Sequence, residues 1–307
     1  VFEQGGIYTD SLDVLPGDTS QIVSDSLFGE YEFSLLDGVR VQDRRNNYHV
    51  YHHYQLVDSS QLVYLFHEFD REKQVNLYED ENISTTRSAI GGKSNADFYK
   101  QNTYFFSPTK TIDSTVYQLF QNKIGLKGKI SGIYYEGFYK QRNYRFRHYF
   151  EEKQSYLNEA YIGGVLEKQV LGKYFVNAAF EVSPEGYYLG TFEGKYKGIK
   201  LKYISSSQPS TIFQDAYFSN HVQWENPNLD VVNSNQLYGE ALLKIKKGTS
   251  IKPFFDVSNL NNFIYFGQDS LVYQNAENIQ LLNVGIDGQL KMKNWYFRQF
   301  LKYAQSS

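Results

Sequence analysis

The sequence of 307 residues has no cysteine, one methionine and six prolines. The absence of cysteine excludes disulfides, thiolate zinc sites, iron–sulfur clusters and a cysteine nucleophile. No apolar run reaches the roughly 18 residues that a membrane-spanning helix needs. The mean hydropathy of −0.53 still permits a transmembrane β-barrel, because apolar residues alternate with polar ones along its strands.

The chain also has no large net charge of either sign. The formal net charge is −3, which gives no argument for nucleic-acid binding, and we predict no nucleic-acid partner. Aromatic residues, in contrast, make up 17% of the chain, and there are 23 glycines. Abundant tyrosine, phenylalanine and glycine, without a sustained 3.6-residue period, predict an all-β protein.

The beginning of the chain differs from the rest. Residues 1–39 carry eight carboxylates and neither lysine nor arginine, and we expect residues 1–40 to form an acidic, loop-rich segment with short strands. Asp10 and Asp13 do not have the spacing of a calcium loop. Residues 41–307 are expected to form barrel strands, with short basic turns on one edge and longer polar loops on the other.

Alternation of apolar and polar residues marks strand candidates after about residue 44. They cover 48–56, 61–69, 130–139, 144–150, 160–170, 174–182, 187–196, 199–204, 237–246, 251–257, 279–292 and 295–304.

The turn at Lys293-Asn294 gives the sharpest test of register. A two-residue turn there pairs Met292 with Trp295 and places apolar residues on one face and polar residues on the other. The same agreement holds around turns at 171–173, 197–198 and 247–249, the last of which pairs Ala241 with Phe255. Four hairpins in register indicate a long antiparallel meander.

Three features favour a membrane barrel over a soluble sandwich. The strands reach about ten residues, short turns alternate with longer stretches at 205–235 and 258–278, and aromatic residues lie near strand ends. We therefore predict an antiparallel up-and-down transmembrane β-barrel, either complete or a portion of a larger one, in contact with the lipid bilayer and lipopolysaccharide. The candidate aromatic girdle consists of Tyr174, Tyr188, Tyr196, Trp295, Phe297 and Tyr303.

The polar face of the hairpins is rich in cations. If this face lines a water-filled lumen, its charge raises the local concentration of anionic solutes. Glu193, Glu240 and Asp287 neutralise part of that charge. The candidate lumen-lining residues are Arg145, Arg147, Lys195, Lys200, Lys202, Lys244, Lys252, Lys291, Arg298 and Lys302.

The C-terminal hairpins contain the stretches Asn235–Lys244, Ser250–Phe255, Asn261–Phe266 and Val284–Phe297. In these stretches the sequence resembles the putative porins of Bacteroidota. The resemblance covers about the last two thirds of the chain, and it implies a Gram-negative outer-membrane location, a closed barrel and solute passage. One departure is the ending Gln305-Ser306-Ser307, where outer-membrane barrels generally have a terminal aromatic residue, and it leads us to consider a segment of a larger barrel.

Three hypotheses for function follow. The first is a porin-like, non-enzymatic channel for small hydrophilic solutes that favours anions. The second is a structural barrel subunit of an envelope secretion or uptake complex, with envelope lipoproteins or other barrel subunits as partners. The third is a soluble β-sandwich that binds carbohydrate through exposed tyrosine and tryptophan.

Other chemistry has weak support in the sequence. On a strand, His49 and His53 share a face while His52 points away. No well-spaced carboxylate completes a metal site with these histidines or with His67, so no metal or cofactor is predicted. The motifs of serine hydrolases, zinc proteases and nucleotide-binding loops are absent. The chain is therefore not expected to be an enzyme.

Overall fold

The computed structural model describes residues 2–3, 7–9, 32–34, 39–57, 62–81, 83, 104–148 and 154–307. Most of the predicted acidic segment 1–40 lies outside these residues. Where its strands are described, β1 (Phe2–Glu3) pairs with β4, and β2 (Ile7–Thr9) pairs with β3 (Glu32–Ser34).

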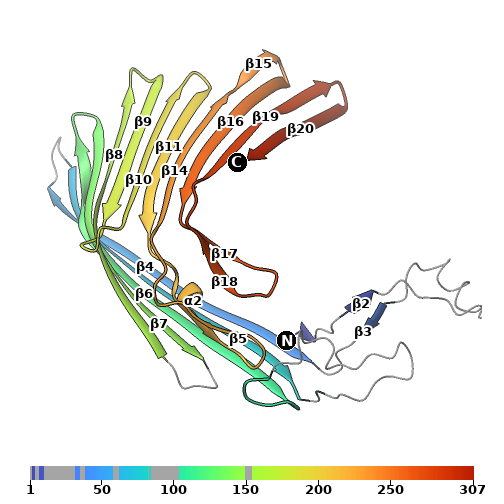
Figure 1. Ribbon diagram of the computed structural model, residues 1–307. Coiled ribbons are helices and arrows are strands. Elements are labelled where there is room, and N and C mark those ends of the chain that lie inside the picture. The colour runs from blue at the N-terminus through green and yellow to red at the C-terminus, as the bar shows by residue number, and fades with distance from the viewer. Residues whose placement is uncertain are drawn as a thin grey trace, which may run out of the picture.

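One large antiparallel sheet forms the body of the molecule (Figure 1). From β4 to β20 each strand lies beside its neighbour in sequence, apart from the small elements in the loops, so the predicted up-and-down order is confirmed. Its strands after β1 are β4 (Arg40–Val57), β5 (Leu62–Asp80), β6 (Thr111–Ile130), β7 (Ile133–His148), β8 (Gln154–Val170), β9 (Tyr174–Val182), β10 (Tyr188–Tyr196), β11 (Ile199–Gln208), β14 (Val232–Ala241), β15 (Leu243–Lys246), β16 (Thr249–Asn261), β19 (Ile279–Met292) and β20 (Trp295–Ser306).

The sheet is strongly curved and open. Figure 1 shows it bending around a concave side, with β4 and β20 at its two separate edges. Within the described residues β20 pairs only with β19, so no pairing closes the barrel.

Short turns join the strands at one end of the sheet. Ser131-Gly132 and Lys197-Gly198 both have positive φ angles at their two central residues, 50° and 78° in the first and 44° and 92° in the second. This is the two-residue geometry that matches the twist of neighbouring strands. The predicted registers around 171–173, 197–198 and 293–294 are confirmed.

The predicted register at 247–249 is wrong by two residues. Phe255 pairs with Gly239, not with Ala241. The turn is one residue shorter than expected, and an irregularity between Lys244 and Lys246 shifts the pairing by one more. A shift of two leaves every side chain on its predicted face, because side chains alternate with a period of two.

Two strand predictions change in the structure. β6 was not expected, and the candidates 130–139 and 144–150 form the single strand β7. The longer loops at the other end contain α2 (Ile212–Asp215), the hairpin of β12 (Ala216–Phe218) with β13 (Gln223–Glu225), and the hairpin of β17 (Phe263–Phe266) with β18 (Val272–Asn275). No helix in the described part of the chain is long and apolar enough to cross a membrane.

The two faces of the sheet differ in polarity. Figure 1 shows α2 and the β17–β18 hairpin on the concave side, and α2 residues line a cavity together with Arg142 and Glu159. The face that carries these two residues is therefore concave. The convex face carries large apolar side chains that are exposed, among them Ile162 (62%), Leu166 (54%) and Phe180 (57%).

No second sheet covers this convex apolar face in the described structure, and the three other sheets have two short strands each. A β-sandwich needs two packed layers. The soluble sandwich hypothesis is therefore wrong.

Candidate solute pathway

Ion pairs cross the concave face from strand to strand. Lys123 on β6 lies 2.6 Å from Glu136 on β7, and Lys140 on β7 pairs with Glu181 on β9. At the other end of the sheet, Arg298 makes a two-point contact with Asp287, at 3.0 and 2.7 Å. Charged groups are expected on a wet lumen wall and not on a face in contact with hydrocarbon.

Eight of the ten predicted lumen-lining residues lie on the concave face. Strand alternation and the observed registers place them there. They are Lys195, Lys200, Lys202, Lys244, Lys252, Lys291, Arg298 and Lys302.

The predicted Lys195–Lys200 opposition is present and is relieved by a carboxylate. The two lysines face each other across β10 and β11, and both form ion pairs with Glu193. The distance from Lys200 Nζ to the Glu193 carboxylate is 3.3 Å. Lys252 similarly pairs with Glu240 at 3.4 Å. These carboxylates neutralise part of the basic face, as the sequence suggested.

Arg145 and Arg147 are misplaced in the predicted set. On β7 they alternate with Tyr144 and Phe146, which line the concave cavity, so they share the convex face with Tyr139. The Arg145 guanidinium lies 5.8 Å from the centre of the Tyr156 ring, which is 64% exposed on β8. The sequence pattern predicts two strands, 130–139 and 144–150, where the structure has one. The alternation of side chains therefore could not be counted from the first segment to the second.

Strand alternation places all six candidate girdle residues on the convex face, although Tyr188, at the loop end of β10, is also among the residues that line the concave-side cavity. Tyr174 and Tyr196 stack with 4.2 Å between ring centres at the short-turn end of β9 and β10, and Trp295 and Phe297 lie at the same end of β20. Tyr188 and Tyr303 lie toward the opposite end of their strands. This gives aromatic residues at both ends of the apolar face, and their contact with lipid stays a prediction.

The loop between β11 and β14, residues 209–231, is fixed to the loop ends of β6 and β7. Asn220 is fully buried, and its amide Nδ2 donates to the carbonyl of Ser107 at 2.8 Å and to Thr111 Oγ1 at 2.9 Å. Its backbone N–H donates to Asp113 at 2.8 Å. Nearby, the backbone N–H of Phe218 donates to His148 Nδ1 at 3.4 Å. This loop is thus held in one position on the concave side.

Aromatic rings stiffen the same loop. Tyr217 and Trp224 stack at 4.8 Å across β12 and β13, and Phe213 lies 5.4 Å from Trp224. The Trp224 indole N–H donates to the carbonyl of Phe213 at 3.0 Å. Burial raises the pKa of Tyr217 to about 12, and burial also raises the pKa of Asp215 although Ser210 donates a hydrogen bond to it. Tyr217 therefore stays neutral at ordinary pH.

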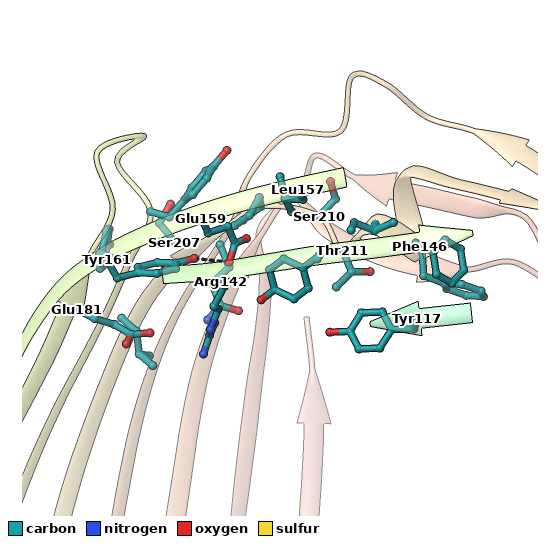
Figure 2. A pocket seen from close by; sticks show the side chains of 18 residues that line it. Tyr117, Arg142, Phe146, Leu157, Glu159, Tyr161, Glu181, Ser207, Ser210 and Thr211 are labelled. Carbon is teal, nitrogen blue, oxygen red and sulfur yellow. Dashed lines mark hydrogen bonds between the residues drawn. The ribbon is translucent and has the colours of Figure 1, made fainter. Parts of the chain in front are cut away.

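A cavity of about 340 Å³ lies between this loop and the strands β6 to β10 (Figure 2). Its strand side is formed by Tyr117, Arg142, Tyr144, Phe146, Glu159 and Tyr161. Its loop side is formed by residues 209–213, together with Ser207 and Gln208 at the end of β11. Figure 2 shows the Tyr161 hydroxyl bonded to Glu159, a contact of 3.1 Å.

Sequence reasoning missed this cavity. Arg142, Glu159 and the tyrosines alternate along their strands, but only the register shows that Arg142 faces Glu159 across β7 and β8. The contact with the loop joins residues more than a hundred positions apart, and no local pattern encodes it.

A second grouping also emerges from pairing between strands. His49 Nδ1 lies 2.6 Å from Asp70 Oδ1, and ligand atoms of His49, Asp70 and Glu68 lie within 4.8 Å of one another. These carboxylates come from the neighbouring strand β5, so residue spacing along β4 does not reveal them. As expected, His52 points to the other face, where its ring lies 4.9 Å from that of His67.

The fold and its two-faced sheet define the wall of an outer-membrane-type β-barrel. A family model described as putative porin matches residues 1–307, and the chain belongs to this family. The solved structure of a copper transporter, OprC, is similar over 86% of this chain and 55% of its own, with 9% identity and a TM-score of 0.51. The family and the fold place the protein in the outer membrane.

The likeness to OprC concerns the fold alone, because the identity is 9%. This chain spans about half of the length of OprC. Among curated proteins, none matches the chain.

Proposed function

We propose that this protein is a porin-like, non-enzymatic conduit for small hydrophilic solutes in the Gram-negative outer membrane. The observation that carries the proposal is the division of one curved sheet into an apolar convex face and an ion-paired concave face. Under this proposal the convex face contacts the bilayer and lipopolysaccharide, and solutes move along the concave face.

A preference for anions is the finer part of the proposal. Eight cations on β10 to β20 share the concave face with four carboxylates, Glu193, Glu240, Asp256 and Asp287. Lys202, Lys244 and Lys302 have no acidic partner within 4.0 Å among the described residues. This half of the concave face therefore carries a surplus of fixed positive charge, which raises the local concentration of anions beside β10 to β20.

Reversal potentials in planar bilayers test this preference. Under a KCl gradient the wild-type channel should favour chloride, and the triple variant K202E/K244E/K302E should shift selectivity toward potassium. These three lysines leave no carboxylate orphaned when replaced. The matched control R145E/R147E changes two charges on the convex face and should leave the reversal potential unchanged. An unchanged potential in the triple variant would refute the anion preference.

The second candidate is a structural barrel subunit, with envelope lipoproteins or other barrel subunits as partners. The inward position of the 209–231 loop and of the β17–β18 hairpin favours it, because both occupy concave-side space (Figure 1). A bilayer that stays silent with correctly folded protein would favour this structural role over the conduit.

A further inference from the structure

The cavity beneath the 209–231 loop combines aromatic faces with a balanced set of charges. Tyr117, Tyr144 and Phe146 come from β6 and β7, with 6.2 Å between the ring centres of the two tyrosines. Two carboxylates line the cavity, Glu159 and Glu181, and the second pairs with Lys140.

Arg142, the cation that lines the cavity, can donate further hydrogen bonds. Arg142 Nε donates to Gln121 Oε1 at 2.7 Å, and its terminal nitrogens have no hydrogen bond within the described residues. Glu159 accepts a bond from Tyr161 and also interacts with the Tyr144 hydroxyl, and a carboxylate with about four acceptor positions still has lone pairs left. The cavity therefore offers both donors and acceptors to a guest.

These features select against a charged guest. With Lys140 counted, two cations face two carboxylates, so an anion or a cation gains no net attraction here. A guest with several hydroxyls can accept from Arg142 and donate to Glu159 at the same time. Tyrosine faces carry negative charge density and attract the polarised C–H groups of a saturated ring.

We propose that this cavity binds a neutral saccharide of one or two rings. The proposal rests on the proposed conduit, because the lumen is the route by which a solute reaches the cavity. A volume of about 340 Å³ lies at the lower end of the roughly 300–1,000 Å³ range of small-molecule sites, which fits a short saccharide.

Phe213 links the cavity to a further aromatic surface. Its ring lies 6.4 Å from Phe146 inside the cavity and 5.9 Å from Phe266, which is half-exposed on the β17–β18 hairpin. Aromatic rings thus continue from the small hairpins to the cavity wall and give an entering sugar ring successive faces to contact.

Calorimetric titration of the purified full chain in detergent micelles tests the proposal. Maltose serves as the neutral probe, and gluconate serves as a charged polyol. We expect saturable heat with maltose and at least tenfold weaker binding of gluconate. Equal or tighter binding of gluconate, or the absence of saturable heat with maltose, would overturn the proposal.

Variants locate the binding in this cavity. Tyr144→Ala removes one stacking face and should weaken maltose binding about tenfold. Glu159→Gln keeps the shape but loses the charged acceptor, and should weaken binding about fivefold or more. The control Tyr139→Ala removes a tyrosine from the convex face of the same strand and should leave binding unchanged. Unchanged affinity in both cavity variants, with native-like circular dichroism, would also overturn the proposal.

The two proposals fail in different readouts. Binding is measured in micelles without any ion flow, whereas the conduit is measured as conductance. A conducting protein that does not bind maltose would refute the saccharide site and leave the conduit intact. A protein that binds maltose but does not conduct would refute the conduit and leave the cavity assignment standing as a site of capture.

Discussion

Replacement of Asn220 by alanine should release the 209–231 loop from the wall of the sheet. The Asn220 side chain makes five hydrogen bonds and is fully buried. Its Oδ1 accepts from the backbone N–H groups of Phe106 and Ser107, both at 3.0 Å. Its Nδ2 donates to the carbonyls of Ser107 and Lys110 and to Thr111 Oγ1, at 2.8, 3.2 and 2.9 Å.

The size of the effect follows from the partners left behind. A hydrogen bond contributes about 1 kcal/mol net, and an unsatisfied buried partner costs about 1–3 kcal/mol. Water that enters the opened site satisfies some of the five partners, so we expect local opening to become easier by about 3 kcal/mol. This corresponds to a roughly 100-fold rise in the opening equilibrium.

Hydrogen exchange read by mass spectrometry measures this opening directly. Peptides that cover 104–110 and 209–226 should lose protection, while peptides from β8 to β10 should not change. Asn226→Ala is a matched control in the same loop, because its side chain makes a single bond, to the carbonyl of Gln214 at 3.2 Å. We expect at most about a tenfold effect there. Equal protection in Asn220→Ala and wild type would refute the account of a fixed loop.

Two further predictions concern the stability of the sheet, measured by denaturant unfolding in lipid vesicles. Lys140→Met leaves the Glu181 carboxylate without its cation in a largely buried position and should lower the free energy of unfolding by about 3 kcal/mol. Lys195→Met should lower it by less than about 1 kcal/mol, because Lys195 is 48% exposed and Glu193 still pairs with Lys200. Equal losses in the two variants would contradict this difference. Gly285→Ala should cost about 1–3 kcal/mol, because its Cβ would lie 2.4 Å from the carbonyl oxygen of Leu301, and Gly288→Ala on the same strand should be nearly neutral, with its closest atom at 3.8 Å.

Much of the sheet could be predicted because short turns fix register locally. Around Lys197-Gly198 and Lys293-Asn294 the turn length and the alternation agree, so each pair follows from the one before it. At 247–249 the same reasoning failed, because an irregular pairing near Ile245 leaves no mark in the alternation of apolar residues.

β6 shows why other strands escaped prediction. Both of its faces mix apolar and polar residues, with Leu119 on the concave side and Gln118 and Asn122 on the convex side, so neither reads as apolar. The position of Arg145 was wrong for a related reason. Its face depends on an unbroken count of residues along β7 from Tyr139, and no sequence pattern indicates that β7 is continuous there.

The candidate site was the least predictable part. Its chemistry depends on Arg142 and Glu159 meeting across two strands and on Asn220 reaching a segment 107 residues away. Contacts of this kind arise from the whole fold and have no short-range signature.

The proposed conduit requires lipid to cover the convex face, and the two tryptophans of the chain allow a direct test of this contact. Trp295 is 69% exposed on that face, whereas Trp224 belongs to the concave-side loop. In vesicles of brominated lipid, the W224F protein, which retains Trp295, should lose most of its tryptophan fluorescence, and the W295F protein, which retains Trp224, should keep it. Undiminished Trp295 fluorescence in brominated lipid would contradict the placement of this face in the bilayer.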